Sequence, residues 1–273
     1  MAVLSPTTLL AWFDFGHMGL TQFLNSRNTY LGANDGVQLV GFGAPQLRAN
    51  LALTNYFKDG PIGRHSYGRY VEFHSGAPHG VFSLSTFGDA DNRAYYNRAA
   101  WTVAVVFRPM SVVGNQVLIS KRAAHNTVDL TFSQRLMLSG STLKAACASS
   151  ASVQNEITIA EAVTTGKSYI AYMSKADGAN LNAGIKEVGA ASWLTATPTG
   201  SLTVLWLATA DMYLNAQRNS SDTADQSHGE IDYNAACWWY SALTPAAIQA
   251  GIEDHFGIAN PSAGYPRSRI VNA

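Results

Sequence analysis

The sequence predicts an all-β protein, a sandwich of two sheets closed by one short helix. Short runs rich in Val, Ile, Thr, Tyr, Phe and Trp recur along the chain, separated by clusters of Gly, Pro, Asn, Asp and Ser, which is typical of strands joined by turns. Apolar and polar residues alternate within several of these runs, as in strands with one buried face. Helical spacing of apolar residues stands out near the C-terminus, at residues 248–256.

The first quarter of the chain contains few clear strands. Residues 8–15 predict an edge or closing strand. Residues 16–68 are loop-rich and contain Asn34-Asp35-Gly36, a strong turn signal that precedes a short strand expected at residues 37–42. Residues 68–73 predict the next strand.

The middle of the chain predicts the centre of a sheet and a meander. Residues 101–109 place Trp101, Val103, Val105 and Phe107 on one core face, and Pro109 ends the strand because it cannot donate to the ladder. Further strands are expected at residues 117–120, 128–132, 135–138, 143–148 and 202–208, and a hairpin over residues 169–185 that turns at Asp177-Gly178.

Residues 229–258 predict a strand, a turn and a helix. Glu230, Asp232 and Asn234 fall on one face of the strand and alternate with apolar neighbours. Thr244 is suited to cap the helix and Pro245 to its first position. The apolar stripe that follows, ended by a glycine, predicts a helix against the rim of the sandwich.

Several of these strings resemble the motifs of a known family. GEID at residues 229–232 and WWYSALTPAAIQ at 238–249 resemble the closing motif of LamG-like, concanavalin A-like jelly-roll domains. LAWFD at residues 10–14 resembles the opening strand of such domains, particularly those in bacteriophage structural proteins, and residues 68–73 and 101–109 resemble their core strands. The resemblance implies a jelly-roll β-sandwich over residues 1–259 with a short C-terminal helix, followed by an extended arm over residues 260–273.

Composition limits the function classes. The 273 residues are 47% hydrophobic, enough for a substantial core, and the net charge is zero, which argues against nucleic-acid or membrane partners. Only 13% of the residues are charged, against about a quarter in typical soluble domains. The N-terminal residues lack the features of a signal peptide, so we expect synthesis in a host cytoplasm. Cys147 and Cys237 are then expected to be reduced and buried.

Catalytic and metal-binding motifs find little support. Laminarinase-type glycoside hydrolases share the resembled fold and carry Glu-x-Asp-x-Glu, but Asn234 stands where the acid/base would be. No nucleophile elbow or phosphate-binding loop occurs. Residues 89–92 resemble half of a calcium loop without its closing ligands. We therefore expect a protein that is not an enzyme and has no metal or cofactor.

Aromatic side chains are the candidate glycan contacts, because lectin-like jelly rolls hold sugars by stacking rings on them. Tyr95 and Tyr96 lie among polar residues and are the best candidates, followed by Trp193 and Tyr213. The alternative for each is packing inside the domain or at an interface.

The arm is the candidate subunit contact. Tyr265, Ile270 and Val271 offer apolar anchors, and Arg267 and Arg269 offer charges for carboxylates on a neighbour. The alternative is that the arm packs on its own domain.

Two functions follow from the residues and the resemblance. The first is a structural protein of a bacteriophage virion, either a capsid decoration or a tail accessory protein, in contact with other virion proteins and assembled as a homo-oligomer. The alternative is a carbohydrate-binding module that recognises a bacterial surface glycan.

Overall fold

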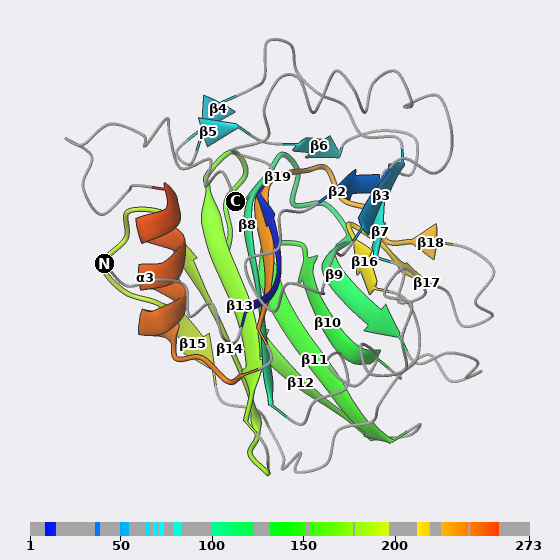
Figure 1. The fold of residues 1–273 in the computed structure, drawn as a ribbon, viewed down its shortest axis with the longest axis vertical. Coiled ribbons are helices and arrows are strands. Elements are labelled where there is room, and N and C mark those ends of the chain that lie inside the picture. The colour runs from blue at the N-terminus through cyan, green and yellow to red at the C-terminus, as the bar shows by residue number, and fades with distance from the viewer. Residues whose placement is uncertain are drawn as a thin grey trace.

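Antiparallel pairing organises the strands into two sheets, as the period of two predicts (Figure 1). The computed structural model describes residues 9–14, 36–38, 50–54, 64–65, 68–69, 71–73, 79–82, 100–122, 132–150, 153–176, 178–196, 212–218, 225–239 and 241–256. Within these ranges, no helix has the length and hydrophobicity that crossing a membrane requires.

Sheet A contains the strand that the sequence places at the centre of the fold. Its strands are β1 (Leu9–Asp14), β6 (Val71–Phe73), β8 (Trp101–Pro109), β13 (Tyr169–Lys175), β14 (Leu181–Glu187), β15 (Leu194–Ala196) and β19 (Ile231–Trp239). They are ordered β1-β19-β8-β13-β14-β15, and β6 also pairs with β19. The predicted hairpin is confirmed as β13 and β14, with Gly178 at φ +65° in its turn.

Sheet B is a meander extended by short strands. Its strands are β2 (Gly36–Gln38), β3 (Asn50–Thr54), β7 (His79–Phe82), β9 (Asn115–Arg122), β10 (Phe132–Ser139), β11 (Thr142–Ser150), β12 (Val153–Ile159) and β16 (Met212–Leu214). They are ordered β12-β11-β10-β9-β16-β7-β3-β2. Two small pairs complete the described strands, β4 (Arg64–His65) with β5 (Gly68–Arg69) and β17 (Gln217–Arg218) with β18 (Asp225–Gln226).

One predicted boundary is wrong. Separate strands were expected at residues 128–132 and 135–138, but Phe132–Ser139 is one strand. The register with β9 shifts between Phe132 and Gln134, so one extra residue interrupts the alternation without ending the strand. Residues 128–131 and the predicted strand at 202–208 lie outside the described residues.

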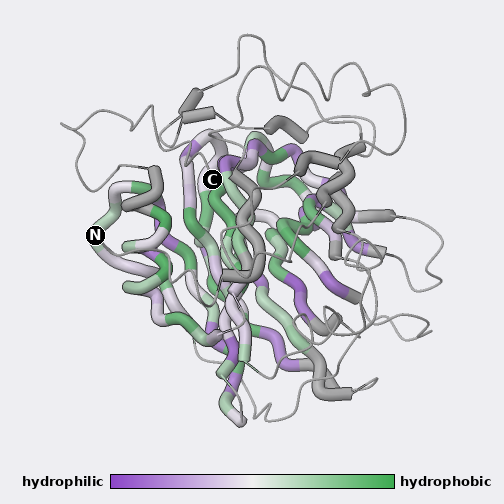
Figure 2. The backbone as a smooth tube through the Cα atoms, in the orientation of Figure 1, coloured by the Kyte–Doolittle hydropathy of each residue, from purple (hydrophilic) through white to green (hydrophobic). Residues whose placement is uncertain are grey.

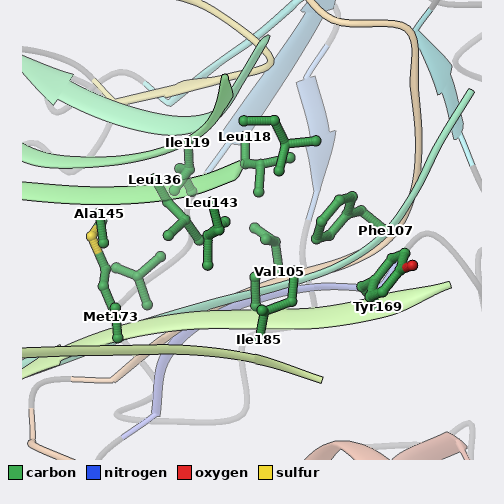
Figure 3. Packing of buried hydrophobic residues seen from close by; sticks show 14 of the residues in the cluster. Val105, Phe107, Leu118, Ile119, Leu136, Leu143, Ala145, Tyr169, Met173 and Ile185 are labelled. Carbon is green, nitrogen blue, oxygen red and sulfur yellow. The ribbon is translucent and has the colours of Figure 1, made fainter. Parts of the chain in front are cut away.

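Apolar side chains from both sheets fill the space between them (Figure 3). Val105, Phe107 and Ile185 come from sheet A, and Leu136 and Leu143 come from sheet B. All five have 0% exposure. Fully burying side chains of this size stabilises the fold by about 1.5–3 kcal/mol each.

The helix α3 (Pro245–Phe256) covers the outer face of sheet A, which corrects the predicted position at the rim (Figure 1). Thr244 caps it as expected, because its Oγ1 accepts a hydrogen bond from the Ala247 N–H at 3.2 Å. Ile248 and Ile252 are fully buried against sheet A. The helix therefore explains why β8 is apolar on both faces, and hydrophobic residues recur along both elements in Figure 2.

A hydroxyl on sheet A fastens the chain that leads into α3. Thr102 Oγ1 donates to the Ser241 carbonyl at 2.8 Å and accepts from the Leu243 N–H at 2.9 Å. The residue is fully buried, so these bonds satisfy its polar atom away from water. The helix is thus held by hydrogen bonds at its entrance and by apolar packing along its length.

Both cysteines are buried and neither forms a disulfide, and they lie on opposite sides of sheet A. Cys147 belongs to the core between the sheets, and Cys237 belongs to the cluster under α3. A sheet therefore separates the two thiols. Burial raises the pKa of the Cys147 thiol to about 12, although the charge of Lys175 opposes this shift.

We expect the free energy of unfolding to fall as the pH rises from about 9 to about 12. The unfolded Cys147 thiol ionises near pH 9.0, whereas the folded thiol keeps its proton until about 12. The folded state then binds more protons than the unfolded state, so one group lowers the stability by up to about 1.4 kcal/mol per pH unit. Buried Tyr172, whose pKa is raised to about 12 by desolvation, adds to the slope above pH 10.0.

Urea denaturation at pH 8, 9 and 10 measures this slope. Cys147→Ala should flatten it between pH 9 and 10 and leave the tyrosine contribution above that range. Equal slopes for the variant and the natural protein in that window would contradict the prediction.

Candidate functional site

The acidic residue within the closing strand β19 and the one just before it lie in different environments. Asp232 is 1% exposed and lies directly opposite Arg108 of β8. Arg108 Nε and Nη2 both donate to Asp232 Oδ2, at 2.8 and 2.5 Å. Glu230, by contrast, is exposed. The two carboxylates therefore do not form a pair of equivalent groups around one reacting atom.

Asn234 occupies a β-bulge. Tyr233 pairs with Phe107 and Ala235 pairs with Val106, so Asn234 is the extra residue between them. Its side chain is fully buried. Together with the guanidinium on Asp232, this arrangement gives no support to the acid/base pair of the glycoside hydrolases that Glu230, Asp232 and Asn234 resemble in sequence.

Two buried amides hold the loop that precedes β19. Asn215 Nδ2 donates to the Gly229 carbonyl at 3.0 Å, and Asn215 Oδ1 accepts from the Gly229 N–H at 3.1 Å. Gln116 Oε1 accepts from the Glu230 N–H at 2.9 Å. A Cβ on Gly229 would lie 2.9 Å from the Cβ of buried Gln116, so any other residue would force Gln116 to shift. The glycine of the GEID motif thus has a packing role.

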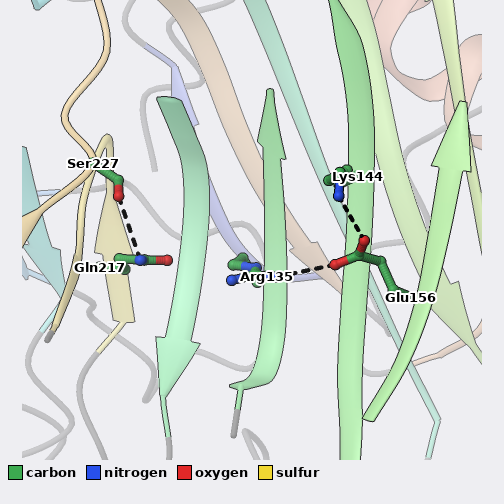
Figure 4. A network of polar contacts seen from close by, with 5 residues as sticks. All are labelled: Arg135, Lys144, Glu156, Gln217 and Ser227. Carbon is green, nitrogen blue, oxygen red and sulfur yellow. Dashed lines mark hydrogen bonds and ion pairs between the residues drawn. The ribbon is translucent and has the colours of Figure 1, made fainter. Parts of the chain in front are cut away.

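The outer face of sheet B carries a cluster of charged side chains, Arg135, Glu156 and Lys144, which we call the sheet-B charge cluster (Figure 4). Lys144 Nζ lies 2.9 Å from Glu156 Oε1, and Arg135 Nη2 lies 3.2 Å from Glu156 Oε2. The side chains are 33%, 14% and 31% exposed for Lys144, Arg135 and Glu156 respectively. They come from the adjacent strands β11, β10 and β12.

Backbone register explains how the sheet-B charge cluster forms. Arg135 lies opposite Ala146, and Ala146 lies opposite Glu156, so the arginine reaches over a small side chain to its carboxylate. Exposed ion pairs contribute only about 0.2–1 kcal/mol each, so the strands do not depend on the cluster for stability. The cluster therefore places a guanidinium, an ammonium and a carboxylate together on a partly exposed face of the sheet.

The predicted glycan-contacting aromatics that are described do not form open platforms. Tyr213 is 3% exposed in β16, so its ring is not available at the surface. Trp193 packs edge-on against Tyr172 of sheet A at 5.2 Å between ring centroids, and its Nε1 donates to Gln249 of α3 at 3.1 Å. Both side chains therefore pack within the domain, which was the alternative to a glycan contact. Trp193 is partly buried because it packs on the cluster under α3, and periodicity within a strand cannot reveal such a contact.

The other predicted site residues lie outside the described residues. These are Tyr95 and Tyr96, and the arm residues Tyr265, Arg267, Arg269, Ile270 and Val271. Their proposed contacts stay predictions. In the part of the chain that is described, no three His, Cys, Asp or Glu side chains gather as a metal site would require.

Sequence reasoning missed the sheet-B charge cluster and Arg108. Both leave a period-two signal: Arg135 alternates with the core residues Leu136 and Leu138, and Arg108 follows the core face of β8. Alternation could assign each residue to the outer face. It could not show which outer residues meet, because that depends on strand register, and Arg108 and Asp232 are 124 residues apart in the chain.

No protein-family model and no curated protein matches this sequence. Solved structures do resemble its fold. A mutant of Trypanosoma rangeli sialidase that displays trans-sialidase activity superposes with a TM-score of 0.59 at 11% identity, over 91% of this chain and 33% of the sialidase chain. The binding domain of botulinum neurotoxin DC in complex with SialylT gives 0.53 at 8% identity, over 77% of this chain and 48% of that chain.

The chain thus spans about a third to a half of the length of these structures. At such low identity the likeness shows the fold alone. The chain is an all-β sandwich of the jelly-roll type, with antiparallel sheets and a short helix near its C-terminus.

Proposed function

We propose that this chain is a non-enzymatic, lectin-like module that binds a glycan bearing acidic groups through the sheet-B charge cluster. The observation that carries the proposal is the cluster itself, in which Arg135 and Lys144 both contact the carboxylate of Glu156 on a partly exposed sheet face. The fold supports it, because one similar structure is a neurotoxin binding domain in complex with SialylT and another is a sialidase.

The chemistry of the cluster suits an acidic sugar. A guanidinium presents parallel N–H donors that match the two oxygens of a carboxylate, and an ammonium adds a second charge. A ligand carboxylate can approach Arg135 and Lys144 while Glu156 orients both side chains. Binding of this kind weakens as salt screens the charges.

The test compares acidic and neutral oligosaccharides on the purified full chain. We expect sialylated or uronic-acid oligosaccharides to bind by calorimetry and their neutral analogues to bind at least about tenfold more weakly, since a charge-assisted hydrogen bond contributes roughly 1.5–3 kcal/mol. Arg135→Gln should abolish that preference, and Glu156→Gln should strengthen binding of the acidic ligand.

Lys167→Gln is the matched control. Lys167 also forms an exposed ion pair, with Glu187 at 2.9 Å, but it belongs to a different surface. Equal affinity for acidic and neutral ligands would contradict binding through these charges. Equal losses in Arg135→Gln and Lys167→Gln would mean that the glycan does not bind at the sheet-B charge cluster.

A second proposed role is that of a structural protein of a bacteriophage virion, a capsid decoration or tail accessory protein that displays this module. The resemblance of the opening and closing strands to phage domains favours it, as does a charged fraction of only 13%, which suits a surface covered by neighbouring subunits. Co-purification with virions at a fixed copy number relative to the major capsid protein would support this role.

A further inference from the structure

The loop between β8 and β9 presents two large apolar side chains to solvent. Met110 is 43% exposed and Val113 is 81% exposed. Among the described residues, the one other large hydrophobic side chain of comparable exposure is Leu194 of β15, at 50%. Two such side chains within one short loop make an apolar spot that a partner can cover.

Contacts within the loop hold these two side chains outward. Val112, which lies between them in the chain, packs on the core between the sheets. Gln116 Nε2 donates to the Ser111 carbonyl at 2.8 Å. Gly114 has φ +72°, and its carbonyl accepts from the Gly140 N–H at 2.9 Å. The loop therefore cannot turn its exposed side chains inward without losing these contacts.

Two exposed glutamates flank the apolar spot. The Met110 N–H donates to the Glu230 carbonyl at 2.8 Å. On the other side, the turn that bonds to the loop accepts from the Ala162 N–H through the Ser141 carbonyl at 2.8 Å, and Glu161 is the residue before that donor. Neither glutamate forms an ion pair with another described residue. We call Met110, Val113, Glu161 and Glu230 the acidic tip.

Two cations lie close to the acidic tip, and each already has a carboxylate. Lys167 lies in a loop whose backbone donates to the Pro109 carbonyl, and its Nζ pairs with Glu187 Oε2 at 2.9 Å. Arg108 pairs with Asp232. The acidic tip therefore keeps its negative charge. A partner that fits it carries apolar side chains together with positive charges.

The arm at residues 260–273 has this composition. It carries Arg267 and Arg269 and contains no Asp or Glu. Its large apolar side chains are Tyr265, Ile270 and Val271, two of which directly follow the second arginine. The charge of the arm is thus opposite to that of the acidic tip, and its apolar residues adjoin its charges as they do at the tip.

The course of α3 brings the chain toward the acidic tip. The helix is entered beside Thr102, near the start of β8, and it then lies against residues further along that strand, such as Val106 (Figure 1). A strand rises about 3.3 Å per residue, so the nine residues of β8 span about 30 Å, and residues 257–273 span nearly twice that length when extended. The arm is therefore long enough to reach the tip of its own chain.

We propose that the arm docks on the acidic tip of its own chain, with its apolar side chains over the loop and its arginines beside the glutamates. A tether of this length gives the arm an effective concentration of about millimolar at the tip, which favours the same chain over a second copy. The acidic tip is separate from the sheet-B charge cluster, so the docking does not depend on the proposed glycan binding.

The first test is trypsin cleavage of the full chain after Arg267 and Arg269, followed by intact mass. Docking shields both sites, and the cleavage rate follows the population of released arm when release is fast. Val113→Gln should raise the rate by about tenfold, since burying a valine side chain shifts an equilibrium by roughly that factor or more. Glu161→Gln with Glu230→Gln should also raise it, because the arginines lose their partners.

Leu194→Gln is the matched control, since it removes an exposed apolar side chain elsewhere and should leave the cleavage rate unchanged. Cleavage of Val113→Gln, or of the double glutamine variant, at the same rate as Leu194→Gln would overturn the proposal. Protection that increases with protein concentration would mean that the arm docks on a second copy, which would overturn docking within one chain.

Oxidation of Met110 by dilute hydrogen peroxide is the reciprocal measurement, because a docked arm shields the thioether. Arg267→Gln with Arg269→Gln should raise the rate of sulfoxide formation at Met110, read by peptide mass. Lys167→Gln, at a lysine that is paired with Glu187, should not change it. Equal rates in the double arginine variant and the natural protein would also overturn the proposal.

Discussion

Replacing Arg108 with Met is expected to lower the free energy of unfolding by about 3–5 kcal/mol, the usual cost of removing one partner from a buried ion pair. Asp232 is 1% exposed and receives two hydrogen bonds from the guanidinium. Met fills much of the volume of the arginine stem but removes the guanidinium that donates two hydrogen bonds to the carboxylate. Urea denaturation at pH 7 measures the loss.

The double variant Arg108→Met with Asp232→Leu is the control. It removes both charges, so it should recover most of the stability that Arg108→Met loses. A loss of stability below about 1 kcal/mol in Arg108→Met would contradict the prediction, because it would mean that this pair contributes no more than an exposed ion pair does. Because Asp232 stands in the strand that resembles a hydrolase motif, a large loss would assign it a structural role.

Phe107→Ala is expected to destabilise the sandwich by a similar amount, about 3–5 kcal/mol. Phe107 is fully buried between the sheets, and its ring lies 6.0 Å from that of Tyr169. Truncation leaves a cavity beside β8 and β13. These strands are hydrogen-bonded to each other in sheet A, so they cannot move far enough to fill it. The same urea titration reports the change.

Phe107→Leu is the matched comparison, because it keeps most of the apolar volume and should cost less than about 1.5 kcal/mol. Similar losses for Leu and Ala would mean that the aromatic shape, rather than the filled volume, matters at this position. A loss below about 1 kcal/mol in Phe107→Ala would show that the core can repack around it.

These two positions are consecutive in β8 and serve opposite faces of sheet A. Phe107 points into the core between the sheets, and Arg108 reaches Asp232 on the other side. The loops before β19 are held by Gln116 and Asn215, so the strand carrying Asp232 is fixed at its start.

Local features of the chain were legible in the sequence because they depend on neighbours a few residues apart. The Thr244 cap, the Gly178 turn and the core face of β8 each follow from a hydroxyl, a positive φ or a period of two. Together with the spacing of the strands, these features determined the all-β class and the short helix.

Contacts between distant segments were decided only by the tertiary structure. The bulge at Asn234, the helix on the outer face of sheet A and the meeting of Arg108 with Asp232 all depend on strand register and sheet order. Lys121 and Lys175 show the same limit. Alternation assigns both to the core face, but a lysine by itself predicts a solvent-exposed side chain, and both are buried. Register is set by the packing of whole sheets, and that energy is distributed over residues too far apart in the chain for a local pattern to record.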